Sequence, residues 1–398
     1  MAGFAIREAM SDIAEAPGKT WFWDLEKAVI DASRCIQCGA CIAACPSDSI
    51  GIGADDLPKL VKMCTGCSLC WDFCPRGGLR AEATWTITGR GAPRQPGLGV
   101  VQAQYTARAN PPVPGAQDGG VVSAILIALL EAGELDGVLL ARPSRTEPWK
   151  GEAFLARTPE EVIASAGSFY NQTLALGHLD LKRYQLPPKP RIALVGTPCE
   201  IEGLKAMQAR PWEWGASRVD AVVLTIGLLC TKSFNYEGLM LREIEARRGI
   251  PLDRIGKIDI LHGKLYLYGH DGELLLEEQI RHFHGSALKG CDECADFLGH
   301  AADIAVGSVG SANGYSSILV RTAAGKRAIE QSRARLELHD LERPEALEKL
   351  DALDKKVAAG ALKRPFDPEA PLFIDFAEHL QHYAGSDRAP VTHDAVRY

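Results

Sequence analysis

Two cysteine-rich stretches decide the fold of this chain, namely Cys35-Ile-Gln-Cys-Gly-Ala-Cys-Ile-Ala-Ala-Cys45-Pro and Cys64-Thr-Gly-Cys-Ser-Leu-Cys-Trp-Asp-Phe-Cys74-Pro. In each stretch three cysteines stand two residues apart, and a fourth follows three residues later, directly before a proline. Bacterial ferredoxins use this spacing to hold two 4Fe–4S clusters. A tight loop presents three thiolates to one face of a cluster, and the fourth cysteine, carried past the loop, reaches the other cluster.

The doubled pattern therefore predicts two crossed ligand sets. The first cluster is expected on Cys35, Cys38, Cys41 and Cys74, and the second on Cys64, Cys67, Cys70 and Cys45. Structural zinc uses four ligands per site and does not require four cysteines twice over, each time followed by proline. Disulfides require an oxidising compartment, and the chain shows no export signal. The sequence thus indicates a protein that moves electrons.

Composition narrows the class of protein. The 398 residues are 46% hydrophobic and 24% charged, with a net charge of −7, which is ordinary for a globular protein of two or three domains. The net negative charge gives no sign of the basic surface that nucleic-acid-binding proteins usually carry. The longest apolar run, 121–130, is too short to span a bilayer, and the N-terminus lacks the basic and apolar regions of a signal peptide. We expect a cytoplasmic protein with no membrane span and no nucleic-acid partner.

From about residue 100 the chain shows an α/β pattern. A buried period-two or apolar pattern predicts strands at 100–105, 137–141, 191–196, 219–229, 303–307 and 316–321. Amphipathic patterns predict helices at 121–131, 160–166, 199–208 and 236–248. Residues 257–276 read as a hairpin with an Asp-Gly turn, and residues 325–362 as mainly charged helix.

Four further cysteines remain once the first eight are assigned: Cys199, Cys230, Cys291 and Cys294. Cys199 and Cys230 each follow a predicted parallel strand, and the carboxyl ends of such strands gather at one edge of a sheet. Four thiols are the ligand count of a third cluster. Two alternatives stay open from spacing alone: Cys199 and Cys230 as buried hydrophobic residues, or Cys291 and Cys294 as half of a zinc site.

Residues 100–365 resemble the family of coenzyme F420 hydrogenase/dehydrogenase beta subunits, whose members are iron–sulfur flavoproteins. The stretches that carry the resemblance are 117–124, 166–170, 196–204, Cys230, 291–297 and 302–307. The resemblance implies one FAD, electron exchange with the deazaflavin coenzyme F420, and one 4Fe–4S cluster on Cys199, Cys230, Cys291 and Cys294. Glu200 departs from the family pattern, where glutamine is more usual.

The expected fold is an α+β ferredoxin-like two-cluster domain followed by an α/β FAD-binding domain with a mixed sheet and a C-terminal helical segment. We place the ferredoxin domain with an N-terminal arm at 1–88, the FAD and 4Fe–4S domain at 100–365, and a tail at 366–398. Such a ferredoxin domain joined to this second domain resembles the electron-input subunits of methanogen-type oxidoreductases.

Candidate FAD contacts lie where loops meet helices or strands. Gly119 and Gly120 precede a helix beginning near Val121, and a helix N-terminus favours phosphate. The remaining candidates offer hydroxyls or polar loops at similar junctions: Ser168, Thr197, Asn313, Gly314 and Ser316. A glycine pair alone is more often a plain turn. No GxGxxG fingerprint is present, so a Rossmann NAD site is disfavoured.

The sequence therefore predicts an F420-dependent redox subunit. Hydride would pass between coenzyme F420 and FAD, and three 4Fe–4S clusters would relay single electrons to or from a catalytic subunit of formate dehydrogenase or hydrogenase type. No catalytic side chain is singled out, because hydride transfer at FAD requires none. The alternatives are a ferredoxin-dependent flavoprotein reductase of a tetrapyrrole, or an electron-transfer adaptor without a small-molecule substrate.

Overall fold

The structure is a computed structural model, and it describes residues 20–77, 94–95, 97–179, 181–209 and 219–361. The expected tail, 366–398, lies outside the described residues. Within these ranges no helix combines the length and apolar character needed to cross a bilayer.

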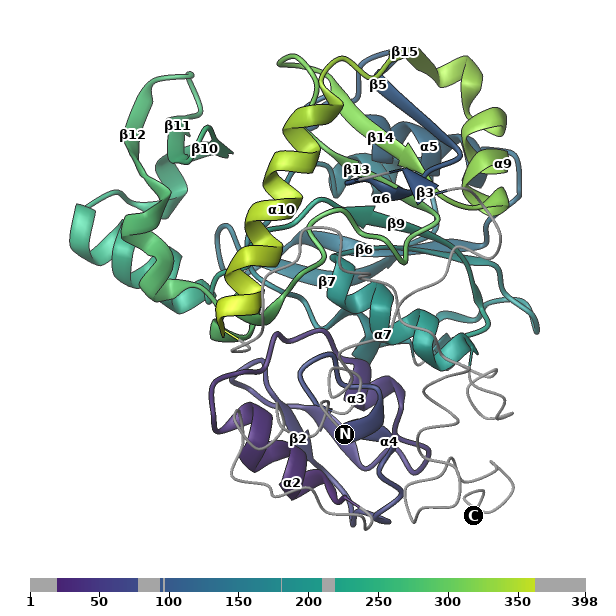
Figure 1. The fold of residues 1–398 in the computed structure, drawn as a ribbon, viewed down its shortest axis with the longest axis vertical. Helices are drawn as coiled ribbons and strands as arrows, with labels where there is room; N and C mark the ends of the chain where they lie inside the picture. The colour runs from purple at the N-terminus through teal and green to yellow at the C-terminus, as the bar shows by residue number, and fades with distance from the viewer. Residues whose placement is uncertain (1–19, 78–93, 96, 180, 210–218, 362–398) are drawn as a thin grey trace.

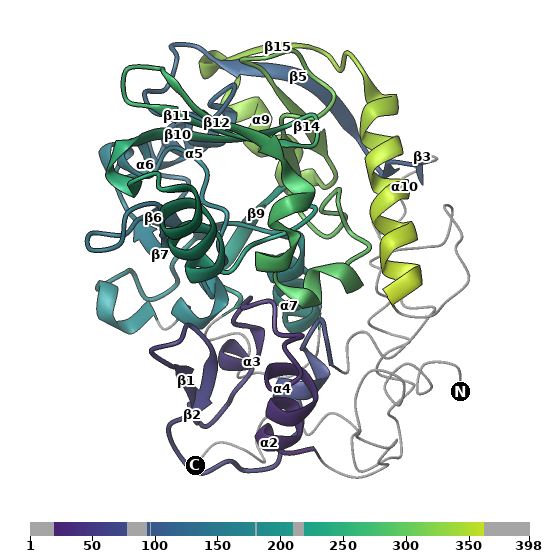
Figure 2. The ribbon, with the colours of Figure 1, turned by 90° about the vertical axis from the view of Figure 1, so that its left-hand side faces the viewer.

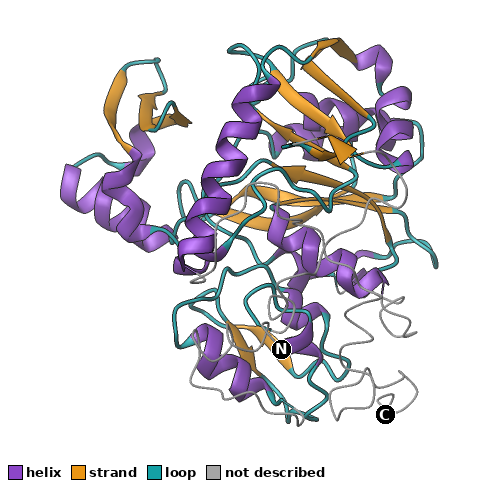
Figure 3. Cartoon of the chain, viewed as in Figure 1, coloured by secondary structure: helices purple, strands orange, loops and turns teal. Residues whose placement is uncertain are grey.

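A mixed eight-stranded sheet forms the large domain (Figures 1 and 3), with strand order β15-β5-β14-β13-β9-β8-β6-β7. Its strands are β5 Ala103–Ala109, β6 Gly137–Pro143, β7 Gly151–Ala156, β8 Ile192–Gly196, β9 Val222–Leu228, β13 Ile304–Gly307, β14 Ser316–Val320 and β15 Leu336–Asp340. The four central strands β6, β8, β9 and β13 run parallel, and the outer pairs are antiparallel. The carboxyl ends of β8 and β9 therefore meet at one edge.

Helices cover both faces of this sheet because successive strand residues face opposite sides. The helices of the large domain are α5 Val121–Glu131, α6 Pro159–Ala164, α7 Pro198–Ala209, α9 Ala323–Gln331 and α10 Pro344–Ala361. On β6, Val138 and Leu140 join the core under α5 and α9, whereas Leu139 joins the core under α7.

The N-terminal cysteine-rich module lies below the large sheet in Figure 1. Its elements are α2 Phe22–Leu25, η1 Glu26–Ile30, α3 Ala40–Ala43, β1 Ile50–Ile52, β2 Pro58–Leu60 and α4 Leu69–Asp72. Phe22 is fully buried against the module. One hydrophobic core contains Ile36 and Ala40 of the module together with Leu176 and Leu204 of the large domain. The module and the large domain therefore share one hydrophobic core.

A small antiparallel sheet stands apart from the main one at the left of Figure 1. It consists of β10 Ile255–Leu261, β11 Lys264–Gly269 and β12 Leu274–Gln279, and it packs on η5 Glu237–Ala246 and η7 Ile280–Ser286. The turned view of Figure 2 shows this sheet crossing in front of the main sheet. The remaining elements are β3 Arg94–Gln95, β4 Gly99–Val100, η3 Ala175–His178, η4 Leu181–Tyr184, η6 Leu252–Arg254, η8 Lys289–Glu293 and η9 Arg333–Arg335.

The mixed sheet and the helix at 121–131 confirm the sequence prediction. The prediction of mainly helix at 325–362 is confirmed by α9 and α10, but the strand β15 between them, which pairs with β5, was not expected. The sequence Leu-Glu-Leu-His-Asp of β15 alternates as a strand should, but the charged helices on both sides masked so short a pattern. The hairpin expected at 257–276 is a three-stranded meander, with an additional turn at His262–Gly263.

Candidate redox site

The two cysteine-rich stretches fold into matching loops. In the first, Gln37 and Gly39 have positive φ angles of 52° and 79°, and in the second Gly66 and Ser68 have φ angles of 67° and 64°. Each loop runs directly into a one-turn helix, α3 or α4. These left-handed residues turn the backbone around the space that the thiols face. The repeat seen in the sequence is therefore a structural repeat.

The first set of thiols gathers as the spacing predicts. Burial raises the pKa of the Cys41 thiol, and the neighbouring Cys38, Cys35 and Cys74 raise it further. Cys74 comes from the second stretch, so the fourth member of this set crosses over. Burial also raises the pKa of Cys35 to about 12. Such buried thiols favour a bound metal cluster, which replaces the proton and compensates the thiolate charge.

The second set gathers in the same crossed manner. Burial raises the pKa of the Cys70 thiol, and Cys67, Cys45 and Cys64 raise it further. All four cysteines line one cavity, whose other walls are Thr20, Ser47, Ser49, Ile50, Thr65 and Ser68.

Backbone amides point at the cysteine sulfurs. The amide donors and acceptors are Gln37 N to Cys35 Sγ at 3.4 Å, Ser49 N to Cys45 Sγ at 3.2 Å, Gly66 N to Cys64 Sγ at 3.4 Å and Arg76 N to Cys74 Sγ at 3.4 Å. Hydrogen bonds of this kind stabilise a thiolate and help to set the potential of a bound cluster. Both sets of residues therefore fit a 4Fe–4S cluster.

The third set also converges, although its members are scattered along the chain. Cys199 lies in the first turn of α7 after β8, and Cys230 follows β9. Burial raises the pKa of Cys230, and Cys291 and Cys294 raise it further, while Cys294 also acts on Cys199. All twelve thiols are free of disulfides. Within the ranges described, no three His, Cys, Asp or Glu side chains lie close enough together to hold a single metal ion.

Glu200 shapes the loop before the third set. Its carboxylate accepts a hydrogen bond from Thr197 N at 2.8 Å and another from Ala175 N at 3.3 Å. Burial raises the pKa of this carboxyl to about 7. The side chain closes the first turn of α7 and ties it to η3. Thr197 Oγ1 in turn lies 3.1 Å from Cys199 Sγ.

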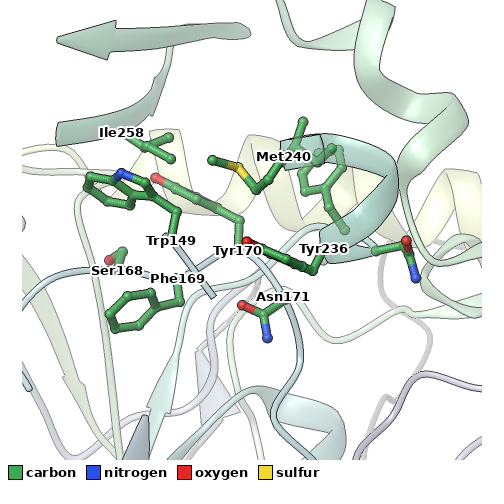
Figure 4. Close-up of a pocket in the computed structure, with 11 residues that line it drawn as sticks. Trp149, Ser168, Phe169, Tyr170, Asn171, Tyr236, Met240 and Ile258 are labelled. Atoms are coloured by element: carbon green, nitrogen blue, oxygen red, sulfur yellow. The ribbon is translucent and has the colours of Figure 1, made fainter. Parts of the chain in front are cut away.

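An aromatic pocket opens beside the third set (Figure 4). Its walls are Trp149, Ser168, Phe169, Tyr170, Asn171, Phe234, Asn235, Tyr236, Leu239, Met240 and Ile258. Five of these eleven residues are aromatic, so the walls are mainly flat and apolar. Trp149 Nε1 donates to Ile255 O at 3.2 Å and Tyr236 Oη to Pro148 O at 2.9 Å, which fixes two of the rings.

The pocket and the third thiol set share a wall. Ser233 N donates to Cys291 Sγ at 3.5 Å, and the next residue, Phe234, lines the pocket. Gln172 Nε2 donates to Ser233 Oγ at 2.8 Å and lies 3.2 Å from Thr197 Oγ1. One hydrogen-bonded layer thus separates the aromatic rings from the sulfurs.

The predicted FAD contacts fall into four places. Gly119, followed directly by Gly120, meets Ser316, with Gly119 N donating to Ser316 Oγ at 3.2 Å. A Cβ at Gly119 would stand 2.6 Å from Ala107 O, and Gly120 has a φ of 68°, so both positions require glycine. Val121 is buried and begins α5.

The other candidates are separated from that glycine pair. Ser168 lines the aromatic pocket, Thr197 stands beside Cys199, and Asn313 and Gly314 occupy an exposed turn before β14. Gln117 connects the glycine loop to the pocket, since its Nε2 donates to the carbonyl oxygen of Ile258, a pocket residue, at 3.0 Å.

Sequence analysis did not identify two groups of residues that belong to the site. The pocket aromatics come from three separate segments, and only Phe169 and Tyr170 stood within a stretch already singled out. The partly buried Arg34 and the buried Arg76 flank the first cysteine set, and Arg76 directly follows the Cys-Pro pair. The signal available in the sequence was the basic residue Arg76 directly after Cys74 and Pro75.

Comparison with known proteins places the chain in a family. Residues 104–180 match the family model for the N-terminal part of the coenzyme F420 hydrogenase/dehydrogenase beta subunit, and residues 190–344 match the model for its C-terminal part. Residues 28–80 match a 4Fe-4S dicluster domain. The chain belongs to the family of F420 hydrogenase/dehydrogenase beta subunits. Membership in this family, with the dicluster domain, supports an iron–sulfur redox role linked to coenzyme F420.

The relatives of this chain are named for different reactions. A coenzyme F420-dependent sulfite reductase of Methanocaldococcus jannaschii is 32% identical over 84% of this chain and 51% of its own length, so this chain spans about half of that protein. One of the subunits of the F420H2 dehydrogenase of Methanosarcina mazei is 29% identical over 79% of this chain and 87% of its own length. A chain of the F420-reducing [NiFe] hydrogenase complex of Methanosarcina barkeri superposes with a TM-score of 0.62 at 26% identity, covering 68% of this chain and 93% of that one.

Proposed function

We propose that this chain is a cytoplasmic redox subunit that exchanges hydride with coenzyme F420 through a bound FAD and relays single electrons through three 4Fe–4S clusters. The electrons pass to or from a separate catalytic subunit of formate dehydrogenase or hydrogenase type. The observation that carries the proposal is the position of the third thiol set between the aromatic pocket, which it reaches through Ser233, and the first thiol set, since Cys38 and Cys199 belong to one buried core.

The cofactors divide the chemistry in a simple way. A flavin accepts two electrons as hydride and releases them singly, whereas iron–sulfur clusters carry one electron each. The residues of the chain bind these groups and keep water away. The turn at Gly120 leads into α5, whose first backbone amides from Val121 onward can receive a phosphate, and the rings of Trp149, Tyr170 and Tyr236 provide an apolar wall for a flat ring system.

Polar groups near the pocket are restrained rather than free to ionise. Burial raises the pKa of Tyr170, and nearby Asp259 and Asp118 raise it further, so its hydroxyl stays protonated at neutral pH. Burial followed by the charge of Asp259 also raises the pKa of Asp118. A neutral hydroxyl beside the pocket can donate a hydrogen bond to a ring carbonyl without changing its charge.

Anaerobically purified protein tests the cofactor content directly. We expect about twelve iron atoms and one FAD per chain, from three clusters with four irons each. About eight irons would remove the third cluster and with it the proposed relay. In a separate assay, reduced or oxidised coenzyme F420 is mixed with an artificial electron donor or acceptor, and its absorbance band is followed. No change in that band would favour the adaptor without a small-molecule substrate, and consumption of a tetrapyrrole with reduced ferredoxin would favour the reductase alternative.

Two variants test the pocket. Trp149→Ala removes one wall, and we expect KM for coenzyme F420 to rise at least tenfold or FAD to be lost, because about 2 kcal/mol of apolar contact disappears. Phe154→Ala is the matched control, since Phe154 is a half-buried aromatic residue that packs against Arg142 and is not one of the pocket walls. Equal behaviour of both variants would contradict the assignment of the pocket.

A further inference from the structure

Three charged side chains fill the contact between the N-terminal module and the loop that bears Cys291 and Cys294. We call this group, Arg34, Arg76 and Glu293, the charged seam. Arg76 is 2% exposed and Glu293 is 5% exposed. Buried charges are costly, so their presence at this contact requires an explanation.

Arg76 contacts the first thiol set through its backbone and the segment of the third set through its side chain. Its backbone N donates to Cys74 Sγ of the first set at 3.4 Å. Its guanidinium Nε donates to the carbonyl oxygen of Gly290, the residue directly before Cys291. Burial lowers the pKa of this guanidinium, but the charges of Cys294, Glu293 and Cys199 outweigh burial and raise it overall. One residue therefore connects the first set with the segment that bears Cys291 and Cys294.

The seam has a net positive charge. Arg34 forms a two-pronged ion pair with Glu293, at 2.7 Å from Nε to Oε1 and 3.0 Å from Nη2 to Oε2. Arg76 Nε lies 4.0 Å from Glu293 Oε2, so its own pairing is weaker. Two arginines and one carboxylate leave one positive charge between the two thiol sets.

The backbone geometry keeps this charge in place. A Cβ at Gly290 would clash with the carbonyl oxygen of Arg34, so the two chain segments touch without an intervening side chain. Arg34 Nη2 also donates to Arg76 O at 2.9 Å. The guanidinium of Arg76 is thus fixed by its neighbours and by burial, and it cannot swing out to solvent.

We propose that Arg76 is a positioning residue that sets the reduction potentials of the first and third clusters, because its buried positive charge lies between their ligand sets and favours the added electron on either. This proposal rests on the proposed function, since it requires clusters on both sets. Among the described walls of its cavity, the second set, Cys45, Cys64, Cys67 and Cys70, has no such charge. Net charge and hydrogen bonding near a cluster are the levers by which a protein tunes its potential.

The test is a potentiometric titration of the full cluster-loaded chain, followed by electron paramagnetic resonance. For Arg76→Gln we expect the equilibrium constant for reduction of the first and third clusters to fall about tenfold, which for one electron is about 59 mV. The second cluster should not move and serves as an internal reference. Arg76→Lys keeps the charge and should restore both potentials to within about threefold of the unaltered chain.

A second variant with the opposite expected effect on the potentials keeps the proposal testable if Arg76→Gln fails to fold. Glu293→Gln removes the negative charge of the seam and should make the same two clusters easier to reduce, even if Arg76→Gln does not load iron. Arg248→Gln is the matched control, since Arg248 is a partly buried arginine paired with Glu243 and Glu278 away from the thiols. It should shift none of the potentials.

The outcomes separate this proposal from the function it rests on. A chain that binds about eight irons overturns both, because no third cluster then exists. A chain with about twelve irons whose potentials are unmoved by Arg76→Gln and Glu293→Gln overturns only the role of Arg76. Equal shifts of all three clusters, or a Lys variant that behaves like the Gln variant, would also overturn it.

Discussion

The two halves of the cysteine-rich module share one loop conformation but meet different surroundings. In the first half, Gly39 faces the large domain, and a Cβ there would stand 2.5 Å from Gly177 N. In the second half, Ser68 takes the matching left-handed position, and its hydroxyl accepts a hydrogen bond from Thr20 N at 2.8 Å. The first half is clamped against the rest of the protein, whereas the second is covered by the N-terminal arm. The contrast makes the first site internal and the second the outer one.

The residue that follows each Cys-Pro pair also differs between the inner and the outer half. Arg76, after Cys74, is buried beside the first set, and Ser47, after Cys45, is half-buried beside the second. Two halves built on one motif therefore differ in charge, with a fixed cation at the inner site and a neutral hydroxyl at the matching outer position. We expect function to divide along this difference, because an inner site passes electrons within the chain and an outer site passes them onward.

The largest expected effect comes from removing one site at a time. Cys38→Ser should stop reduced coenzyme F420 from reducing the second cluster, since the first cluster would lie between them. Cys67→Ser should leave reduction of the first cluster intact, because the second lies beyond it. Rapid-freeze electron paramagnetic resonance measures both, with dithionite as the control reductant. If the second cluster is reduced at an unchanged rate in Cys38→Ser, the order of inner and outer sites is wrong.

Exchanging the residues at the matching left-handed positions, Gly39 and Ser68, tests whether the two loops are packed with different tightness. Gly39→Ser, which installs the residue of the second half, should destabilise the protein by about 3 kcal/mol, because it adds a clash with the backbone at 177 to a left-handed φ. Ser68→Gly should cost less than about 1 kcal/mol, since the lost hydrogen bond to Thr20 is offset by relief of backbone strain. Denaturation midpoints of the anaerobic protein measure both. Equal costs would show that the two loops are equally constrained.

The sequence was sufficient for the features that depend on local spacing. The eight cysteines of the module, their crossed pairing and the helix after Gly120 all follow from patterns within a few residues, and pKa perturbations and backbone geometry agree with them. The convergence of the four remaining thiols was also foreseeable, because Cys199 and Cys230 follow neighbouring parallel strands. The identity of the clusters there remains a prediction.

Features that depend on distant contacts could not be read in advance. The aromatic pocket combines Trp149, Tyr170 and Tyr236, which come together only through tertiary packing. The charged seam joins Arg76 to Gly290, which are 214 positions apart. Neither the direction in which Gly39 faces nor the asymmetry of the two loops is encoded in the cysteine spacing, since both loops satisfy the same motif.

A smaller effect is expected from giving the outer half the charge of the inner one. Ser47→Arg places a cation at the position that matches Arg76. We expect the equilibrium constant for reduction of the second cluster to rise about two- to threefold, less than the effect at Arg76, because Ser47 is half-buried and solvent screens the charge. The increase should shrink in about 0.5 M salt, whereas the effect of Arg76 should persist. A salt-independent increase as large as that at Arg76 would contradict the distinction between exposed and buried charge.

The smallest expected effect concerns an ion pair between the module and the pocket segment. Lys150 Nζ lies 2.9 Å from Asp56 Oδ2 and 2.8 Å from Glu147 Oε2. Burial lowers the pKa of Lys150, but its hydrogen bonds to these carboxylates outweigh burial and raise it overall. The stabilisation is therefore complete below the unfolded pKa of about 10.4 and is lost as pH rises through the higher folded value.

Replacing this lysine tests whether surface charge or backbone contact clamps the inner half. Lys150→Met should lower the unfolding free energy by less than about 1 kcal/mol at neutral pH, and the difference should vanish in high salt or once the pH has risen through the raised pKa of Lys150. Lys59→Met is the matched control, because Lys59 pairs with its neighbour Asp55 within the module, both side chains being about half exposed. A loss at Lys150 as large as that of Gly39→Ser would mean that the ion pair, rather than the close backbone approach at Gly39, holds the inner half in place.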